Sequence, residues 1–111
     1  MPKLDMDRSP TFLRVGLYFG SFNPIHLGHL VIANHMLHEA DLDEVWFVVT
    51  PSSPHKQGVD LIPEQHRLQM ARLAIADHPH LKAIDAEFAL PRPNYTADTM
   101  QHLREAHPEV V

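Results

Sequence analysis

The clearest indication of the fold is the segment 45–50, VWFVVT, a nearly continuous apolar run rich in β-branched side chains. A strand with this pattern is buried on both faces, as the strands of parallel sheets are. Two further segments, 13–19 and more weakly 81–86, also have the composition of strands. The chain is therefore expected to build its core around a sheet.

Helical patterns separate these strands. Residues 27–40 carry apolar side chains at helical spacing, and a second helix is expected to begin with Pro63 as its first residue. Thr96 is a suitable N-cap for a third helix, and residues 109–111 resemble the start of a further strand. The order β-α-β-α-β-α predicts the α/β class, with a Rossmann-like parallel sheet and helices on both faces.

Length and composition favour a single domain. The chain has 111 residues, 44% of them hydrophobic; we expect a flexible leader over 1–11 and one nucleotide-binding domain over 12–111. No apolar run is long enough to span a membrane, and there is no cysteine. The net charge of -5 argues against general nucleic-acid binding. These features predict a cytoplasmic protein without membrane or nucleic-acid partners.

The most informative loop follows the first strand and opens the first helix, with the sequence GSFNPIHLGH. Gly20 would let the backbone approach a ligand, and the N–H groups at a helix start favour phosphate. His26 and His29 share one face there, and Gly28 would leave room for a nucleotide. Two imidazoles can donate hydrogen bonds to the oxygens of a polyphosphate.

Other interpretations of this loop remain open. It lacks the Lys-Ser/Thr of a Walker A loop, and it does not match GxGxxG. Histidines three apart are often incidental on a helix surface. A metal site at His26 and His29 is disfavoured, because no carboxylate or third histidine has the usual spacing. The remaining histidines are expected on the surface, and Trp46 in the core.

The segment GSFNPIHLGH resembles the HxGH signature of the nucleotidyltransferase superfamily, which shares this motif with class I aminoacyl-tRNA synthetases. Within it the chain is similar to bacterial nicotinate-nucleotide adenylyltransferases. Pro54-His55-Lys56 resembles the PHK loop of that family, and residues 94–100, NYTADTM, resemble its SYTxDT segment. The resemblance covers nearly the whole chain after residue 12.

The resemblance implies adenylyl transfer from ATP to nicotinate mononucleotide, giving nicotinate adenine dinucleotide and pyrophosphate. ATP and nicotinate mononucleotide would be the partners, and Mg²⁺ would be bound through the ATP phosphates. The residues implied to contact ATP, of which the two histidines are also catalytic, are Gly20, Ser21, Phe22, His26, Gly28 and His29. Those implied to contact the substrate nucleotide are Asn23, His55, Lys56, Tyr95, Thr96 and Ala97.

Two departures from the family qualify this expectation. Many members have Asp at the position of Asn23 and Gly at that of Phe19. The family also continues with further strands and an ISSTxxR-like motif, so the C-terminal part of the fold is expected to be missing. A non-catalytic nucleotide-binding fragment, or a relative acting on nicotinamide mononucleotide or pantetheine phosphate, is the alternative. An open sheet edge would then favour self-association.

Overall fold

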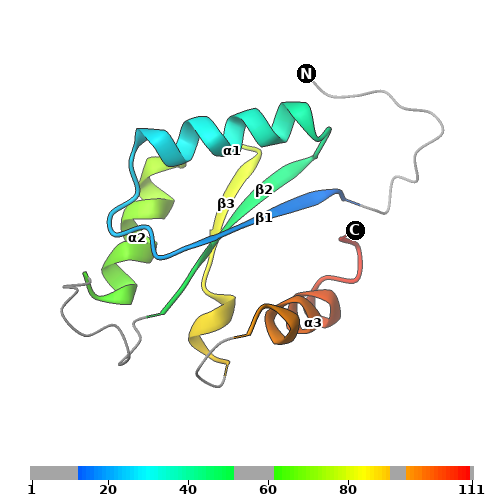
Figure 1. Ribbon diagram of the computed structural model, residues 1–111. Coiled ribbons are helices and arrows are strands. Elements are labelled where there is room, and N and C mark those ends of the chain that lie inside the picture. The colour runs from blue at the N-terminus through cyan, green and yellow to red at the C-terminus, as the bar shows by residue number, and fades with distance from the viewer. Residues whose placement is uncertain (1–12, 52–61, 91–94, 111) are drawn as a thin grey trace.

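The computed structural model describes residues 13–51, 62–90 and 95–110 (Figure 1). The predicted leader, residues 1–11, lies outside the described residues. Along the chain, the elements are β1 (Val15–Gly20), α1 (Leu27–Glu39), β2 (Glu44–Val49), α2 (Glu64–Ala74), β3 (Leu81–Ile84), the short 3₁₀ helix η1 (Ala86–Phe88) and α3 (Thr96–Ala106). In the described part of the chain, the strands form one parallel sheet of order β1-β2-β3.

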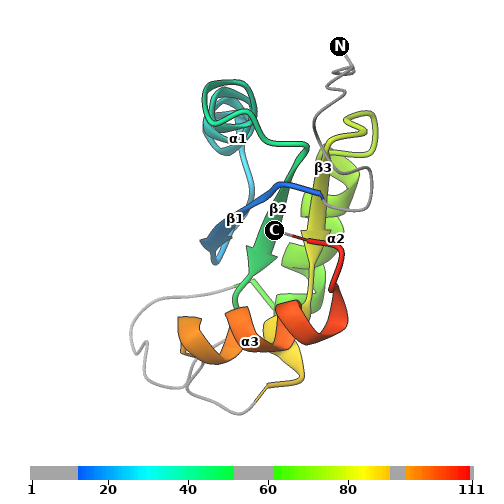
Figure 2. The same ribbon diagram turned by 90° about the vertical axis from the view of Figure 1, so that its right-hand side faces the viewer.

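Helices cover both faces of this sheet. Helices α1 and α2 lie on one face and α3 on the other (Figures 1 and 2). The central strand β2 is buried on both sides: Phe47 belongs to the core beneath α1 and α2, whereas Trp46 faces the groove beside α3. Full burial of a side chain such as Phe47 contributes about 1.5–3 kcal/mol. The predicted fold class and the core position of Trp46 are confirmed.

The outer edge of β1 is open to a further strand. Leu13 forms a parallel bridge with Val110, and the Leu13 N–H donates to the Glu109 carbonyl at 2.7 Å. The expected further strand is therefore represented by one bridge in the described residues. A strand continuing there would give the order 3-2-1-4, that of a Rossmann half-sheet.

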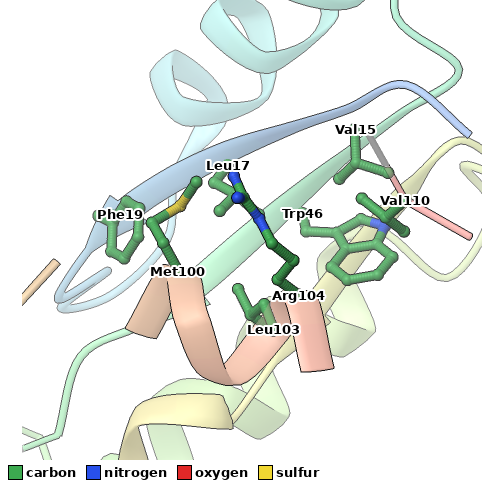
Figure 3. Close-up of a pocket in the computed structure, with 8 residues that line it drawn as sticks. All are labelled: Val15, Leu17, Phe19, Trp46, Met100, Leu103, Arg104 and Val110. Atoms are coloured by element: carbon green, nitrogen blue, oxygen red, sulfur yellow. The ribbon is translucent and has the colours of Figure 1, made fainter. Parts of the chain in front are cut away.

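A groove lies between this edge and α3 (Figure 3). Its volume is about 310 Å³. The residues that line it are mostly apolar: Val15, Leu17, Phe19, Trp46, Met100, Leu103, Arg104 and Val110. The α3 face of the sheet is therefore only partly covered at β1.

Several element boundaries differ from the sequence prediction, and three of them have a clear local cause. The Tyr95 carbonyl accepts the first helical bonds of α3, so Tyr95 is the N-cap and Thr96 the first residue. Pro63 is likewise the N-cap of α2, because its ψ of 140° is extended and its carbonyl accepts from Arg67. Strand β3 ends at Ile84 because the chain turns at Asp85 into η1.

One of the histidines expected on the surface is only partly exposed. His107 is half-buried, with its ring edge-on to Trp46 at a centroid distance of 4.9 Å. The other histidines predicted to be on the surface are exposed: His35, His38, His66, His78, His80 and His102.

None of the helices in the described ranges has the length and apolar character needed to cross a membrane.

Candidate nucleotide-binding site

The first turn of α1 is capped by two histidines that support each other. His26 is the N-cap, and its Nδ1 accepts the Gly28 N–H at 3.1 Å. Nδ1 of His29 accepts the His26 N–H at 3.0 Å. The two rings stack with centroids 3.9 Å apart. This is the reciprocal arrangement of a capping box, with imidazole nitrogens in place of side-chain oxygens.

The capping bonds determine which ring nitrogen can face a ligand. An Nδ1 atom that accepts a hydrogen bond carries no proton, so each neutral ring bears its proton on Nε2. In the described part of the chain, no hydrogen bond uses Nε2 of either ring. The site therefore presents two Nε2–H donors at a helix N-terminus, where anions are favoured.

The surroundings of His29 favour its neutral form. Its ring is half-buried and packs edge-on against Phe22, with centroids 5.0 Å apart. Burial lowers the pKa of His29, and the neighbouring His26 lowers it further. A neutral imidazole keeps its capping bond, whereas protonation at Nδ1 would break it.

Glycines make room for rings in this site. A Cβ at Gly28 would lie 2.9 Å from Cε1 of His26, so the space that we expected for a nucleotide accommodates the His26 ring. A Cβ at Gly20 would lie 3.1 Å from the Phe22 ring. Phe22 itself is 2% exposed and has a φ of 48°, which is uncommon for a residue other than glycine. Its side chain belongs to the core, so contact with ATP would have to come from its backbone.

Asn23 joins the turn to the start of α2. Its Oδ1 accepts the Ile62 N–H at 2.8 Å. Because an amide oxygen accepts this bond as a carboxylate oxygen would, Asn in place of the commoner Asp fits the local geometry. The contact of Asn23 with the substrate stays a prediction.

Sequence reasoning missed one residue beneath the site. Arg67 is fully buried and donates to three backbone carbonyls, those of Ser21, Thr50 and Ile62. The signal was available in the sequence, because Arg67 lies four residues before Ala71 and eight before Ile75, on the apolar stripe of α2.

The predicted substrate residues divide into two groups. Tyr95, Thr96 and Ala97 lie together and exposed at the start of α3. A hydrogen bond of 2.8 Å from the Thr99 hydroxyl to Glu87 ties this helix to η1. His55 and Lys56 fall outside the described residues. No group of three or more His, Asp or Glu side chains that could hold a metal ion occurs among the residues that the structure describes.

A family model described as cytidylyltransferase-like matches residues 17–110. The chain belongs to the cytidylyltransferase-like family. It is 53% identical over 96 residues to a probable nicotinate-nucleotide adenylyltransferase of Flavobacterium psychrophilum, covering 86% of this chain and 50% of the relative. A Bacillus cereus protein of the same name is 41% identical over 97 residues, covering 87% of this chain and 51% of the relative.

Solved structures of related proteins share this fold. Nicotinic acid mononucleotide adenylyltransferase of Plasmodium falciparum, complexed with NaAD, aligns with a TM-score of 0.68 and 21% identity. The alignment covers 89% of this chain and 49% of that one. The chain thus spans about half the length of the curated relatives it matches. The predicted resemblance to nicotinate-nucleotide adenylyltransferases is confirmed.

In this cytidylyltransferase-like chain, the first turn of α1 has the chemistry of an anion site. Its donors are N–H groups of rings held by local hydrogen bonds, so they require little reorganisation when a phosphate arrives. They lie at the carboxyl edge of the sheet, where ligands of such folds bind.

Proposed function

We propose that these residues form the nucleotide-binding half of a nicotinate-nucleotide adenylyltransferase. The enzyme would join ATP and nicotinate mononucleotide to give nicotinate adenine dinucleotide and pyrophosphate. The observation that carries this proposal is the stacked pair of His26 and His29, with both Nδ1 atoms committed to the helix cap and both Nε2–H groups left for phosphate oxygens. We also propose a cytoplasmic location, since the chain has no cysteine and its substrates would be metabolic nucleotides.

The proposed reaction is an in-line displacement at the α-phosphorus of ATP. A phosphate oxygen of nicotinate mononucleotide attacks, and the bond from the α-phosphorus to the oxygen bridging to the β-phosphate breaks. The electron pair of that bond leaves with pyrophosphate. Such transfer depends on positioning and on charge stabilisation. His26 and His29 would donate to oxygens on which negative charge grows. Mg²⁺ carried by the triphosphate would neutralise charge on the leaving group.

The start of α3 offers a place for the nicotinate carboxylate. The N–H groups of Thr96 and Ala97 are the first of that helix, ahead of the bonds of its own ladder. A carboxylate accepts such N–H groups, whereas the amide of nicotinamide presents donors of its own. His55, Lys56 and Asn23 are proposed to complete the contacts with the substrate. The enzyme should prefer nicotinate to nicotinamide mononucleotide, and equal kcat/KM values would contradict this assignment.

A binding experiment on the chain tests the nucleotide site first. Thermal unfolding is followed with ATP and Mg²⁺, with nicotinate mononucleotide, and with Zn²⁺. Ligands that bind the folded state raise Tm. A rise with ATP and Mg²⁺ supports the proposal. A rise with Zn²⁺ alone would identify a histidine metal site instead.

Turnover by the complete enzyme distinguishes catalysis from simple binding. His29→Ala should lower kcat by roughly 10²–10³, the usual cost of one donor to the transition-state charge. His35→Ala, on the exposed surface of the same helix, is the matched control and should leave kcat unchanged. Unchanged pyrophosphate release by folded His29→Ala would contradict the catalytic role. Nucleotide binding without turnover in the unmutated protein would favour the non-catalytic alternative.

A further inference from the structure

The guanidinium of Arg67 lies beside the turn between β1 and α1, residues 21–26, where the ends of three segments meet. Its Nε donates to the Ile62 carbonyl at 2.7 Å. Its Nη1 donates to the Ser21 carbonyl at 2.6 Å and to the Thr50 carbonyl at 2.7 Å. The residue is 0% exposed, so these bonds do not compete with bulk water.

Each acceptor belongs to a different part of the proposed site. Ser21 follows β1 directly, Thr50 follows β2, and Ile62 precedes the start of α2. Two other bonds connect the same segments, one from the Thr50 N–H to the Gly20 carbonyl at 2.9 Å and one from the Ile62 N–H to Asn23. Among the described residues, Arg67 is the side chain through which all three segments are joined.

Only a guanidinium suits this position. Arginine carries five N–H donors in a fixed planar fork, whereas lysine carries its three donors on one rotating nitrogen. Burial lowers the pKa of Arg67 and Glu64 opposes that shift, but a guanidinium remains protonated at neutral pH. A buried charge is a costly way to stabilise a core that apolar packing could fill. Three hydrogen bonds from Arg67 are directed at backbone carbonyls of the site, which indicates a geometric role.

We propose that Arg67 is a positioning residue that holds the turn ahead of His26 at a fixed place relative to β2 and α2. The proposal rests on the proposed function, since it concerns the geometry of the ATP site. Ser21 and Asn23 flank Phe22, and both are anchored from below, the first by Arg67 and the second by Ile62. The backbone from Ser21 to Asn23 is thereby held before any nucleotide binds.

The test compares Arg67→Lys with Arg72→Lys in the chain. Arg72 lies on the same helix but is exposed, and its hydrogen bond to the Ala83 carbonyl of β3, at 3.3 Å, lies away from the turn. Amide hydrogen exchange is measured by NMR, and the Kd for ATP with Mg²⁺ by calorimetry. We expect Arg67→Lys to speed exchange selectively at Phe22 and Asn23 and to raise the Kd by about tenfold. Arg72→Lys should do neither.

The two readouts separate positioning from stability. When a variant is folded before ligand is added, a loss of global stability alone leaves Kd unchanged. Folded Arg67→Lys with unchanged exchange at the turn and unchanged Kd would overturn the inference. So would failure to fold even at low temperature with a stabilising osmolyte, because Arg67 would then support the fold as a whole. If the unmutated chain binds no ATP while exchange at the turn still depends on Arg67, the proposed function fails and the anchoring of the turn stands.

Discussion

At the level of single residues, the properties of the site follow from what an imidazole can do that a hydroxyl or carboxylate cannot. An N-cap is usually Ser, Thr, Asp or Asn, whose whole polar group serves the helix. At His26 and His29 one nitrogen serves the helix and the other is left for a ligand. The cap and the proposed phosphate contacts therefore use the same two rings.

Gly28→Ala tests this dual use. The added Cβ would lie 2.9 Å from Cε1 of His26, so the ring must move and its bond to the Gly28 N–H weakens. Alanine favours the helix by about 0.5–1 kcal/mol, while a lost cap costs about 0.5–2 kcal/mol. We expect little change in the free energy of unfolding but about tenfold weaker ATP binding, measured by urea unfolding and by calorimetry.

Asn34→Ala supplies the control for helix propensity. Asn34 is exposed on the same helix and away from the two rings. This variant should be slightly more stable than the unmutated chain and should bind ATP equally well. If Gly28→Ala also binds ATP as the unmutated chain does, the His26 ring does not need the space over Gly28.

The lowered pKa of His29 predicts how stability depends on pH. Its folded-state pKa lies below the ordinary value of 6.5, because of burial and then of His26. As pH falls through about 6.5, the unfolded chain binds the proton first, so stability falls. The contribution is complete above that pH and is lost as pH falls toward the folded-state pKa.

His29→Gln removes this titration while keeping an acceptor at the third position of the capping box. Thermal unfolding between about pH 7.5 and pH 5.5 should therefore change less in the variant than in the unmutated chain. The histidines away from this pair are common to both proteins and cancel in the comparison. Equal pH dependence of Tm would show that His29 does not titrate differently in the folded and unfolded states.

At the level of elements, periodicity predicted the order of strands and helices because burial dictates it. The continuous apolar run of β2 is needed where both faces of a strand are covered, and helix α1 has apolar spacing where it packs on the sheet. Boundaries were less predictable. Thr96 was expected as an N-cap because its hydroxyl could serve, yet the carbonyl of Tyr95 defines the start of α3.

The parts of the site that sequence did not predict depend on contacts between distant segments. The bonds of Arg67 to Ser21 and Thr50 span 46 and 17 residues, and no local pattern specifies them. The packing of the His26 ring over Gly28 was not predicted, because the rotamer of His26 determines where its ring lies. The contact of Gly28 with ATP stays a prediction. By contrast, the pairing of His26 with His29 follows from a spacing of three residues on a helix, which the sequence contains.

The buried pair of Thr99 and Glu87 yields a prediction about α3. Both residues are buried, and the Thr99 hydroxyl donates to Glu87 at 2.8 Å. Thr99→Val keeps the side-chain shape but removes the donor, which should lower the free energy of unfolding by about 1–3 kcal/mol in urea. Thr99→Ser, which retains the hydroxyl, should lose about 0.8 kcal/mol for its missing methyl group. A valine variant as stable as the serine variant would show that this bond contributes little.

At the level of the whole molecule, the open edge of β1 is the feature most exposed to association. Its groove is apolar, and the bridge between Leu13 and Val110 shows that the edge accepts a parallel strand. We expect the chain to self-associate at this edge, as sedimentation velocity would detect. Val15→Lys at the groove should reduce association. Ile32→Lys, on the exposed apolar surface of α1, should leave association unchanged. If Ile32→Lys reduces association and Val15→Lys does not, the contact lies on α1.

The last prediction is that the chain by itself binds ATP weakly and releases no pyrophosphate. It spans about half the length of its curated relatives, and the groove beside β1 leaves one face of the sheet partly uncovered. The proposed anion site at the start of α1 has its capping hydrogen bonds within this chain, so some affinity for ATP should remain. Transfer needs both substrates held in line, to which positioning contributes several orders of magnitude in rate. Calorimetry and a pyrophosphate-release assay on the purified chain measure the two quantities. Turnover by a monomer at the rate of a full-length relative would show that the residues of this chain suffice for catalysis.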